Sequence, residues 1–99
     1  MERKNKRILR IERYEEIYDK LSRSVCEAES ALEALEALEA LAPELAELEA
    51  YYTGPYWKTD FAADEAGKLP PELKRGVLSE DGVYGLLAEA ARLRALNKD

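Results

Sequence analysis

The most constraining feature of the sequence is a stretch from Arg3 to about Tyr52 that contains no glycine and only one proline. Because Gly and Pro are the strongest local breakers of secondary structure, so long a stretch of Ala, Glu and Leu predicts a continuous helix. Apolar side chains in it recur at alternating spacings of three and four, the pattern of a coiled-coil seam. The first part of this seam comprises Ile11, Tyr14, Tyr18, Leu21, Val25, Ala28, Leu32 and Leu35.

The spacing changes in the middle of the stretch. Within Ala-Leu-Glu repeats, the leucines recur every three residues, which is shorter than the helical period of about 3.6. Each leucine therefore steps about 60° around the axis, and the apolar stripe winds sideways, as in a stammer. These leucines are Leu32, Leu35, Leu38 and Leu41; Leu41, Leu45, Leu48 and Tyr52 then resume a four-three-four rhythm on a different face.

Pro43 lies near this change and allows two interpretations. Inside a helix, a proline removes one backbone hydrogen bond and clashes with the preceding turn, at a cost of about 3 kcal/mol. The helix therefore either kinks and continues, or stops and restarts with Pro43 at the first position of a second helix. Ala42 is a poor N-cap, and no Gly or Asn offers a C-cap. We therefore favour a kinked continuation.

The segment after this helix predicts a short middle helix. Thr53-Gly54-Pro55 supplies a glycine to end one helix and a proline to open the next. The middle helix is expected to run from about Tyr56 to Glu65, with Gly67 ending it.

The segment from Leu69 to Ser79 predicts a second break and then the last helix. Leu69-Pro70-Pro71 interrupts the chain, and residues 71–75 are expected to form one helical turn ended by Gly76. Ser79 then caps a helix over 80–97. Its apolar face comprises Val83, Leu86, Leu87, Ala90, Leu93 and Leu96.

These elements predict one all-α domain over residues 1–99. The long helix (1–52), which is coiled-coil-like, is followed by an aromatic and acidic connector with short helices (53–79). The C-terminal helix (80–97) packs back on the long one.

The net charge of −6 is unevenly distributed. Residues 1–13 hold six Lys/Arg against two Glu, whereas residues 27–49 hold eight Glu and no basic residue. An acidic total argues against nucleic acid as the main partner, because phosphate contacts need clustered cations. A basic start and an acidic later part also oppose the helix dipole, which suggests that another chain uses these charges.

The lengths of the two main helices favour the same conclusion. The long helix spans roughly 70 Å and the C-terminal helix roughly 27 Å, so one chain cannot cover its own seam. We therefore expect an antiparallel homodimer, with the two-fold axis near Ser22–Ser24 and the basic start of each copy facing the acidic part of the other. The alternative is a monomeric hairpin broken at Pro43, with its charges solvated.

Enzymatic chemistry finds little support. The chain has no histidine, and Cys26, its only cysteine, stands in an apolar stretch typical of a buried side chain. We expect no catalytic residue, no metal ligand and no cofactor. Glu-x-x-Glu spacings would suit a carboxylate enzyme that uses a divalent metal, but the Glu-Ala-Leu repeat generates them automatically, so such an enzyme is a remote alternative.

The most specific cluster combines aromatic and acidic residues around the middle helix. Asp60 and Asp64 are four residues apart and share a helix face beside Trp57 and Phe61. One interpretation makes the aromatics core anchors, with the acids capping backbone or pairing with cations. The other makes the cluster a cation site or a partner-binding patch. Its members are Tyr52, Tyr56, Trp57, Asp60, Phe61, Asp64, Glu65 and Lys68.

The second half of the chain also resembles a known family. The residues concerned are Tyr51-Tyr52, Trp57, Asp60-Phe61, Asp64-Glu65, Gly67-Lys68-Leu69-Pro70, Leu73 to Asp81, Tyr84 and Leu86-Leu87. This pattern resembles the bacterial domain-of-unknown-function family numbered 4298. The resemblance implies a short helical bacterial protein and supplies no activity. Gly54-Pro55 departs from the more polar Ser-type cap expected there.

The function expected from these features is that of a protein-protein interaction or assembly module that self-associates and can bind another protein. The basic N-terminus is followed by no unbroken apolar stretch, which argues against a signal peptide or membrane span and favours the cytoplasm. The alternative is an acidic inhibitor or nucleic-acid mimic that acts on a basic partner.

Overall fold

The computed structural model describes residues 5–96, and all regular elements in this range are helical. The elements are α1 (Lys6–Glu27), α2 (Ala31–Ala40), α3 (Ala42–Thr53), α4 (Pro55–Glu65), the 3₁₀ turn η1 (Gly76–Leu78) and α5 (Glu80–Leu96). The predicted all-α class, with a long N-terminal helix packed against the others, is confirmed.

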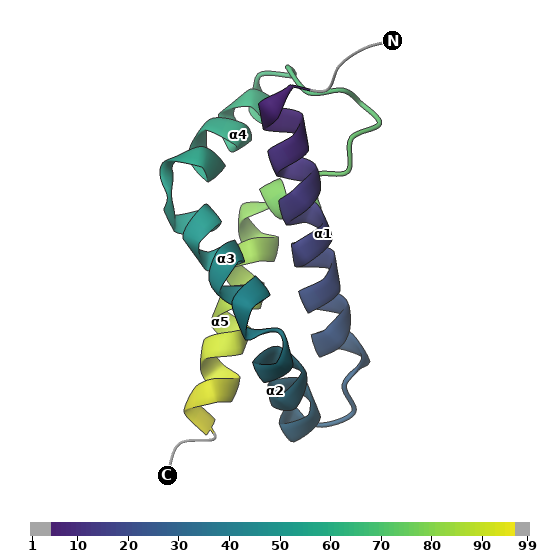
Figure 1. Cartoon of the computed structure of the whole chain (residues 1–99), viewed down its shortest axis with the longest axis vertical. Helices are drawn as coiled ribbons and strands as arrows, with labels where there is room; N and C mark the ends of the chain where they lie inside the picture. Colours follow the sequence, from purple (N-terminus) through teal and green to yellow (C-terminus); the bar gives the residue numbers. More distant parts are fainter. Residues whose placement is uncertain (1–4, 97–99) are drawn as a thin grey trace.

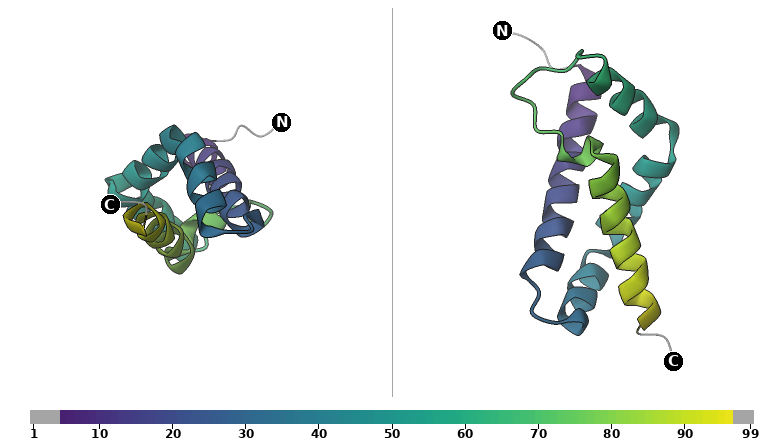
Figure 2. Two further views of the ribbon diagram at one scale, coloured as in Figure 1. Left: turned by 90° about the horizontal axis from the view of Figure 1, so that it is seen from below. Right: turned by 180° about the vertical axis from the view of Figure 1, so that it is seen from behind.

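The helices form an elongated bundle of 51 × 24 × 20 Å. Figure 1 shows α1 along one side, while α2, α3 and α4 return along the other side as a bent arch. The connector after α4 loops out beyond α1 and comes back to η1, from which α5 runs to the end where α2 lies (Figure 2). Helix α1 therefore begins at one end of the bundle, and α5 finishes at the other.

The first helix is shorter than predicted, because the chain breaks between Glu27 and Ala31. Ser30 is the N-cap of α2: its side chain accepts a hydrogen bond from the amide of Glu33 at 3.1 Å. The Glu33 carboxylate reaches back to the amide of Glu29 at 3.4 Å. This reciprocal arrangement resembles a capping box and starts a new helix. The expectation of one helix over 1–52 is therefore wrong.

A second break falls at Leu41, which has φ −106° and ψ 24°. Its amide still donates to the carbonyl of Ala37 at 3.1 Å, and its carbonyl accepts from the amide of Leu45 at 2.9 Å. The interruption is therefore a single residue, and Pro43 lies in the first turn of α3. The favoured kinked continuation is wrong here. The alternative of a restarted helix is correct, except that Ala42 and not Pro43 is the first residue of α3.

The apolar seam of these helices is covered within one chain. Ile11 and Leu21 on α1, Leu38 on α2 and Leu48 on α3 are fully buried, and α5 packs against α2 while η1 packs against α1. Because α2 and α3 fold back along α1, the helices shield one another. The expectation that a lone chain leaves its seam uncovered is wrong. Leu32 is the seam residue that stays outside, with 62% of its surface exposed.

The connector after α4 follows its predicted ends but not its predicted interior. Gly67 has φ +70°, and the amides of Gly67 and Lys68 donate to the carbonyls of Asp64 and Ala63, both at 3.0 Å. This is a Schellman motif, which requires the left-handed conformation that glycine adopts without strain.

The helical turn expected over 71–75 is wrong. The chain makes a turn in which the amide of Leu73 donates to the carbonyl of Pro70 at 3.1 Å, and the 3₁₀ turn begins only at Gly76. Ser79 caps α5 as predicted, because its hydroxyl accepts from the amide of Gly82 at 3.2 Å.

Candidate functional site

The predicted aromatic cluster is largely internal. Trp57 is buried, and its indole Nε1 donates to the carbonyl of Val77 in η1 at 2.9 Å. Its ring stacks on Phe61 at a centroid distance of 5.0 Å and meets the edge of Tyr52 at 4.8 Å. These contacts join α3, α4 and η1. The aromatics thus anchor the core, in line with the first of the two interpretations of this cluster.

Asp60 is a fully buried carboxylate in α4. Its oxygens accept hydrogen bonds from Arg10 Nε and Nη2 at 2.9 and 2.6 Å, from Arg7 Nε at 3.2 Å, and from the Tyr51 hydroxyl at 2.6 Å. A buried charge is tolerated when it is paired and its oxygens are hydrogen-bonded, and both conditions hold here. We refer to Asp60, Arg7, Arg10 and Tyr51 as the Asp60 network.

Two members of the network, Arg10 and Tyr51, have shifted pKa values. The hydrogen bond from Arg10 to Asp60 raises the pKa of the Arg10 guanidinium above its ordinary value. Burial raises the pKa of Tyr51 well above its ordinary value, and the hydrogen bond to Asp60 adds to this effect. A tyrosine that stays protonated and an arginine that stays charged are suited to holding helices together. Neither is poised for proton transfer near neutral pH.

The remaining members of the predicted cluster do not assemble a cation site. Asp64 accepts from Arg75 Nη1 at 2.8 Å, while Glu65 and Lys68 are exposed at the end of α4. Tyr56 is 59% exposed, and the guanidinium of Arg10 lies 4.5 Å from its ring centroid. Within residues 5–96, no group of three or more potential metal ligands comes together.

Two further contacts of α1 were not foreseen from the sequence. The Glu15 carboxylate accepts from the amide of Val77 at 2.7 Å, and Tyr14 stacks on Tyr51 with centroids 4.0 Å apart and planes 2° apart. The sequence indicated that Tyr14 faces other helices, since it belongs to the predicted seam. It gave no indication of the Glu15 contact, because the partner residue lies 62 residues further along the chain.

The basic start and the acidic middle of the chain meet within the molecule. Arg13 Nη2 lies 2.9 and 2.8 Å from the two carboxylate oxygens of Glu47, and Lys20 Nζ lies 3.2 Å from Glu44. A backbone hydrogen bond in the first turn of α3 lowers the pKa of Glu44, and the bond from Lys20 lowers it further. The pairing expected between two copies thus has an intramolecular counterpart, in which α3 lies along α1.

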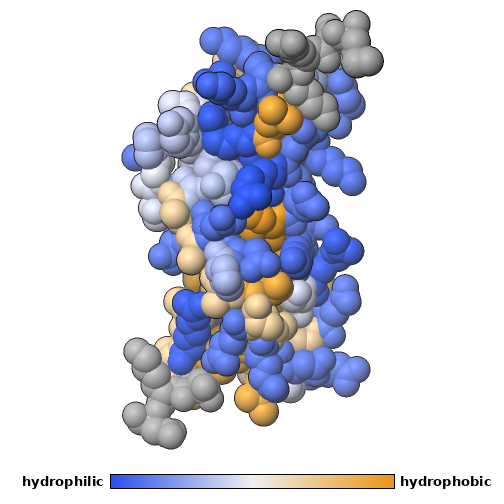
Figure 3. All heavy atoms as spheres, viewed as in Figure 1, coloured by the Kyte–Doolittle hydropathy of each residue, from blue (hydrophilic) through white to orange (hydrophobic). Residues whose placement is uncertain are grey.

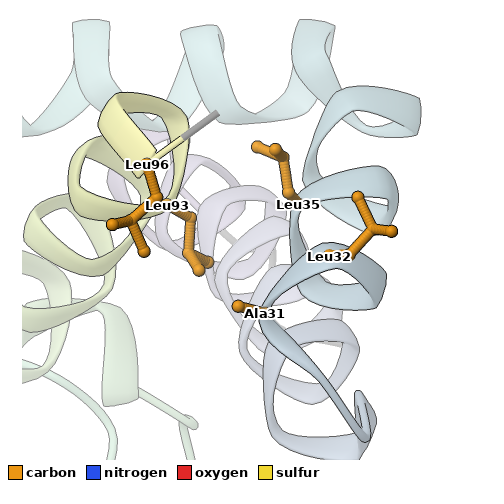
Figure 4. A pocket seen from close by; sticks show the side chains of 5 residues that line it. All are labelled: Ala31, Leu32, Leu35, Leu93 and Leu96. Atoms are coloured by element: carbon orange, nitrogen blue, oxygen red, sulfur yellow. The ribbon is translucent and has the colours of Figure 1, made fainter. Parts of the chain in front are cut away.

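A cleft lies at the opposite end of the bundle, between α2 and α5. Its volume is about 180 Å³, and its lining comprises Ala31, Leu32, Leu35, Leu93 and Leu96. Leu35 and Leu93 are buried and point into the gap between the helices, whereas Leu32 and Leu96 lie at its margins (Figure 4). We refer to these five residues as the end cleft.

The end cleft differs from most of the surface around it. The face shown in Figure 3 is mainly hydrophilic, with scattered hydrophobic residues. Five large apolar side chains are exposed among residues 5–96, and two of them, Leu32 at 62% and Leu96 at 64%, line the cleft. Exposed leucines beside an apolar hollow are typical of a contact surface.

Two other features bear on the expected properties. Cys26 is exposed near the end of α1, so the expectation of a buried cysteine is wrong. In the part of the chain that the structure describes, none of the helices combines the length and the apolar character needed to span a bilayer.

The model of a family described as a domain of unknown function, DUF4298, matches residues 11–97. No curated protein and no solved structure matches the chain.

Proposed function

Because the chain belongs to DUF4298, a family without a defined activity, we propose from its own geometry that it is a protein-binding module. The contact surface is the end cleft between α2 and α5. The observation that supports this proposal is the pairing of two exposed leucines with an adjacent apolar hollow. We further propose that the protein is bacterial, works in the cytoplasm, self-associates and has no catalytic role.

The size of the end cleft fits one apolar side chain of a partner. An enclosed apolar cavity of about 150 Å³ accommodates benzene, and the end cleft has about 180 Å³. Burying a leucine side chain contributes roughly 1.5–3 kcal/mol. Covering Leu32 and Leu96 while filling the hollow therefore supplies the central apolar contact that protein interfaces use.

The aromatic cluster around α4 is a poorer contact surface. Trp57 and Asp60 are buried, and Asp64 is paired with Arg75. These residues lock α4 onto α1, α3 and η1, so changing them affects the fold before it affects binding. The end cleft, by contrast, has exposed side chains that can be substituted without changing the core.

The test is quantitative affinity capture from a bacterial lysate. The chain carrying Leu32→Ser and Leu96→Ser should lose the proteins that the wild-type chain retains, because the apolar contact is gone. The matched control is Tyr84→Ser: Tyr84 lies on the same helix as Leu96 and is equally exposed, at 64%, but it does not line the end cleft. Capture that is unchanged in the Leu32/Leu96 variant would contradict the proposal.

A second candidate function is that of an acidic inhibitor acting on a basic partner. It is favoured by α2, where Glu33, Glu36 and Glu39 are exposed and no basic residue occurs. Such binding should weaken steeply between about 0.1 and 1 M salt, because screening shortens the reach of surface charge from about 10 Å to about 3 Å. It should also weaken in the variant Glu36→Gln, Glu39→Gln. Capture that tolerates salt and depends on Leu32 and Leu96 favours the apolar contact instead.

A further inference from the structure

We propose that the occupant of the end cleft is a second copy of this chain, placed by a two-fold axis at the end of the bundle. This inference rests on the proposed function and names its partner. In the pair, Leu32 and Leu96 of each copy pack at the end cleft of the other. The α1 seam takes no part, because the chain's own helices already bury it.

The first argument is shape. A two-fold interface brings the same surface of two copies together, so that surface must carry both the projections and the hollow that receives them. The end cleft has both: Leu32 and Leu96 project at its margins, and Leu35 and Leu93 form its buried floor. Leu9, which is also exposed, does not line the end cleft. Here one patch supplies both halves of the contact.

The second argument is charge. Glu36 follows Leu32 by one turn on α2, and Arg92 precedes Leu96 by one turn on α5. Both are exposed, and α2 contains three glutamates and no basic residue. Arg92 bonds to Glu89 of its own helix, with its side chain 56% exposed. A two-fold axis that runs along the helices, between α2 and α5, places α2 of each copy against α5 of the other, so acid meets base twice.

These charges set the orientation of the pair rather than its strength. Exposed ion pairs contribute little free energy, while opposed like charges are costly, so complementary rims select one arrangement. In an arrangement in which α2 of one copy faces α2 of the other, two helices whose only charged residues are acidic would lie together. The apolar contact then supplies affinity, and the rims supply specificity.

The first test is sedimentation equilibrium with a reducing agent present, over micromolar to millimolar concentrations. The wild-type chain should dimerise. The Leu32→Ser, Leu96→Ser variant should raise the dissociation constant at least about tenfold, because two buried leucines per copy are lost. The control Tyr84→Ser should leave it unchanged. All three positions are exposed, so far-UV circular dichroism should show the same helix content in each protein.

The second test exchanges the rim charges. Glu36→Arg and Arg92→Glu should each weaken self-association, because each homodimer then opposes like charges twice. Mixing the two variants should restore the pair, since the heterodimer has opposite charges at both rims. A variant Arg92→Gln, which adds no repulsion to Glu89, should weaken the pair less than Arg92→Glu. A mixture no tighter than either variant alone would overturn the proposed arrangement.

The outcomes separate this inference from the proposed function. A wild-type chain that stays monomeric up to millimolar concentration overturns the self-pairing. The same holds for a dimer that is indifferent to Leu32 and Leu96. If capture of another protein nevertheless depends on Leu32 and Leu96, the binding role stands and its partner is a different chain. If neither association depends on them, both proposals fail.

Discussion

Asp60 is the residue on which three helices converge. It lies on α4 and accepts hydrogen bonds from Arg7 and Arg10 on α1 and from Tyr51 on α3. A charge removed from water is tolerated only while its partners stay in place, so this carboxylate penalises any arrangement that separates these helices. The Asp60 network therefore selects one packing of α1, α3 and α4 over looser alternatives.

The predicted consequence is a large difference between two neighbouring aspartates. Asp60→Asn should reduce the free energy of unfolding by about 3 kcal/mol, because an amide cannot accept both bonds from Arg10. Asp64 also pairs with an arginine, Arg75, but its side chain is 29% exposed. Asp64→Asn should therefore reduce the free energy of unfolding by at most about 1 kcal/mol. Urea unfolding monitored by circular dichroism measures both. Equal losses of stability in the two variants would show that the contribution of Asp60 to the free energy of unfolding does not depend on its burial.

This difference could not be read from the sequence. The spacing of four placed Asp60 and Asp64 on one face of a short helix, which is how they lie on α4. Which of the two faces the core depends on where α1 packs, and that is a tertiary property. Trp57 and Phe61 were foreseen as possible anchors because large aromatics bury well in any small core.

At the scale of elements, the first turn of α5 closely approaches the Tyr18 side chain of α1 at Gly82. A Cβ atom at this position would lie 2.5 Å from the Tyr18 hydroxyl oxygen on α1 and 3.3 Å from Ser79 Oγ. Glycine is normally unfavourable inside a helix, by up to about 1 kcal/mol relative to alanine. The unfavourable residue at Gly82 is thus explained by the side chain of Tyr18 packed against it.

Two glycines of α5 test this explanation. Gly85→Ala, where a Cβ meets nothing within 4 Å, should stabilise the protein by about 0.5–1 kcal/mol. Gly82→Ala should lack this gain or reverse it, because the new methyl group meets Tyr18. In a Tyr18→Phe background Gly82→Ala should become more favourable, because the hydroxyl oxygen at 2.5 Å is gone. Thermal unfolding of the six proteins checks this, and a gain at Gly82 equal to that at Gly85 in the wild-type background would contradict it.

The helix boundaries were predicted correctly where a capping or helix-breaking residue marks them. Gly54-Pro55, Gly67 and Ser79 each end or begin a helix for reasons that act over a few residues. The break before α2 also has a local mark, Ser30 followed by Glu33, but the apolar spacing of three and four continues across it. The same capped turn reverses the chain, which neither periodicity nor propensity could indicate.

At the scale of the whole molecule, one apolar core links all the helices. Its buried residues run from Leu93 on α5 and Leu35 on α2 to Trp57 on α4. A chain of this size with a single core is expected to unfold cooperatively, because no element keeps its apolar face covered alone. Helices α2 and α4 lie at opposite ends of the bundle, but they are therefore expected to unfold together.

Cooperativity predicts that two probes report one transition. The fluorescence of Trp57, the only tryptophan, follows the α4 end, while far-UV circular dichroism follows all helices. Their urea midpoints should coincide within error. An early loss of helix that leaves the Trp57 signal unchanged would instead show that the end with α2 and α5 unfolds by itself.

The sequence indicates that the basic start of the chain pairs with its acidic part, and we expected this pairing between two copies. Arg13 with Glu47 and Lys20 with Glu44 satisfy it inside one molecule. A sequence states which charges can pair; whether they pair within or between chains depends on where the helix turns back. The end cleft was not foreseen for a related reason: Leu32 belongs to the regular seam, and its exposure depends on how α2 packs in the folded chain.

The exposed thiol of Cys26 offers a direct way to follow the end of the bundle where α2 lies. It is the only sulfhydryl in the chain, so a spin label attaches at one position without further engineering. It lies near the end of α1, close to the turn into α2. Labels on two copies joined at that end would be near each other, and dipolar spectroscopy would then read the geometry of the pair in solution.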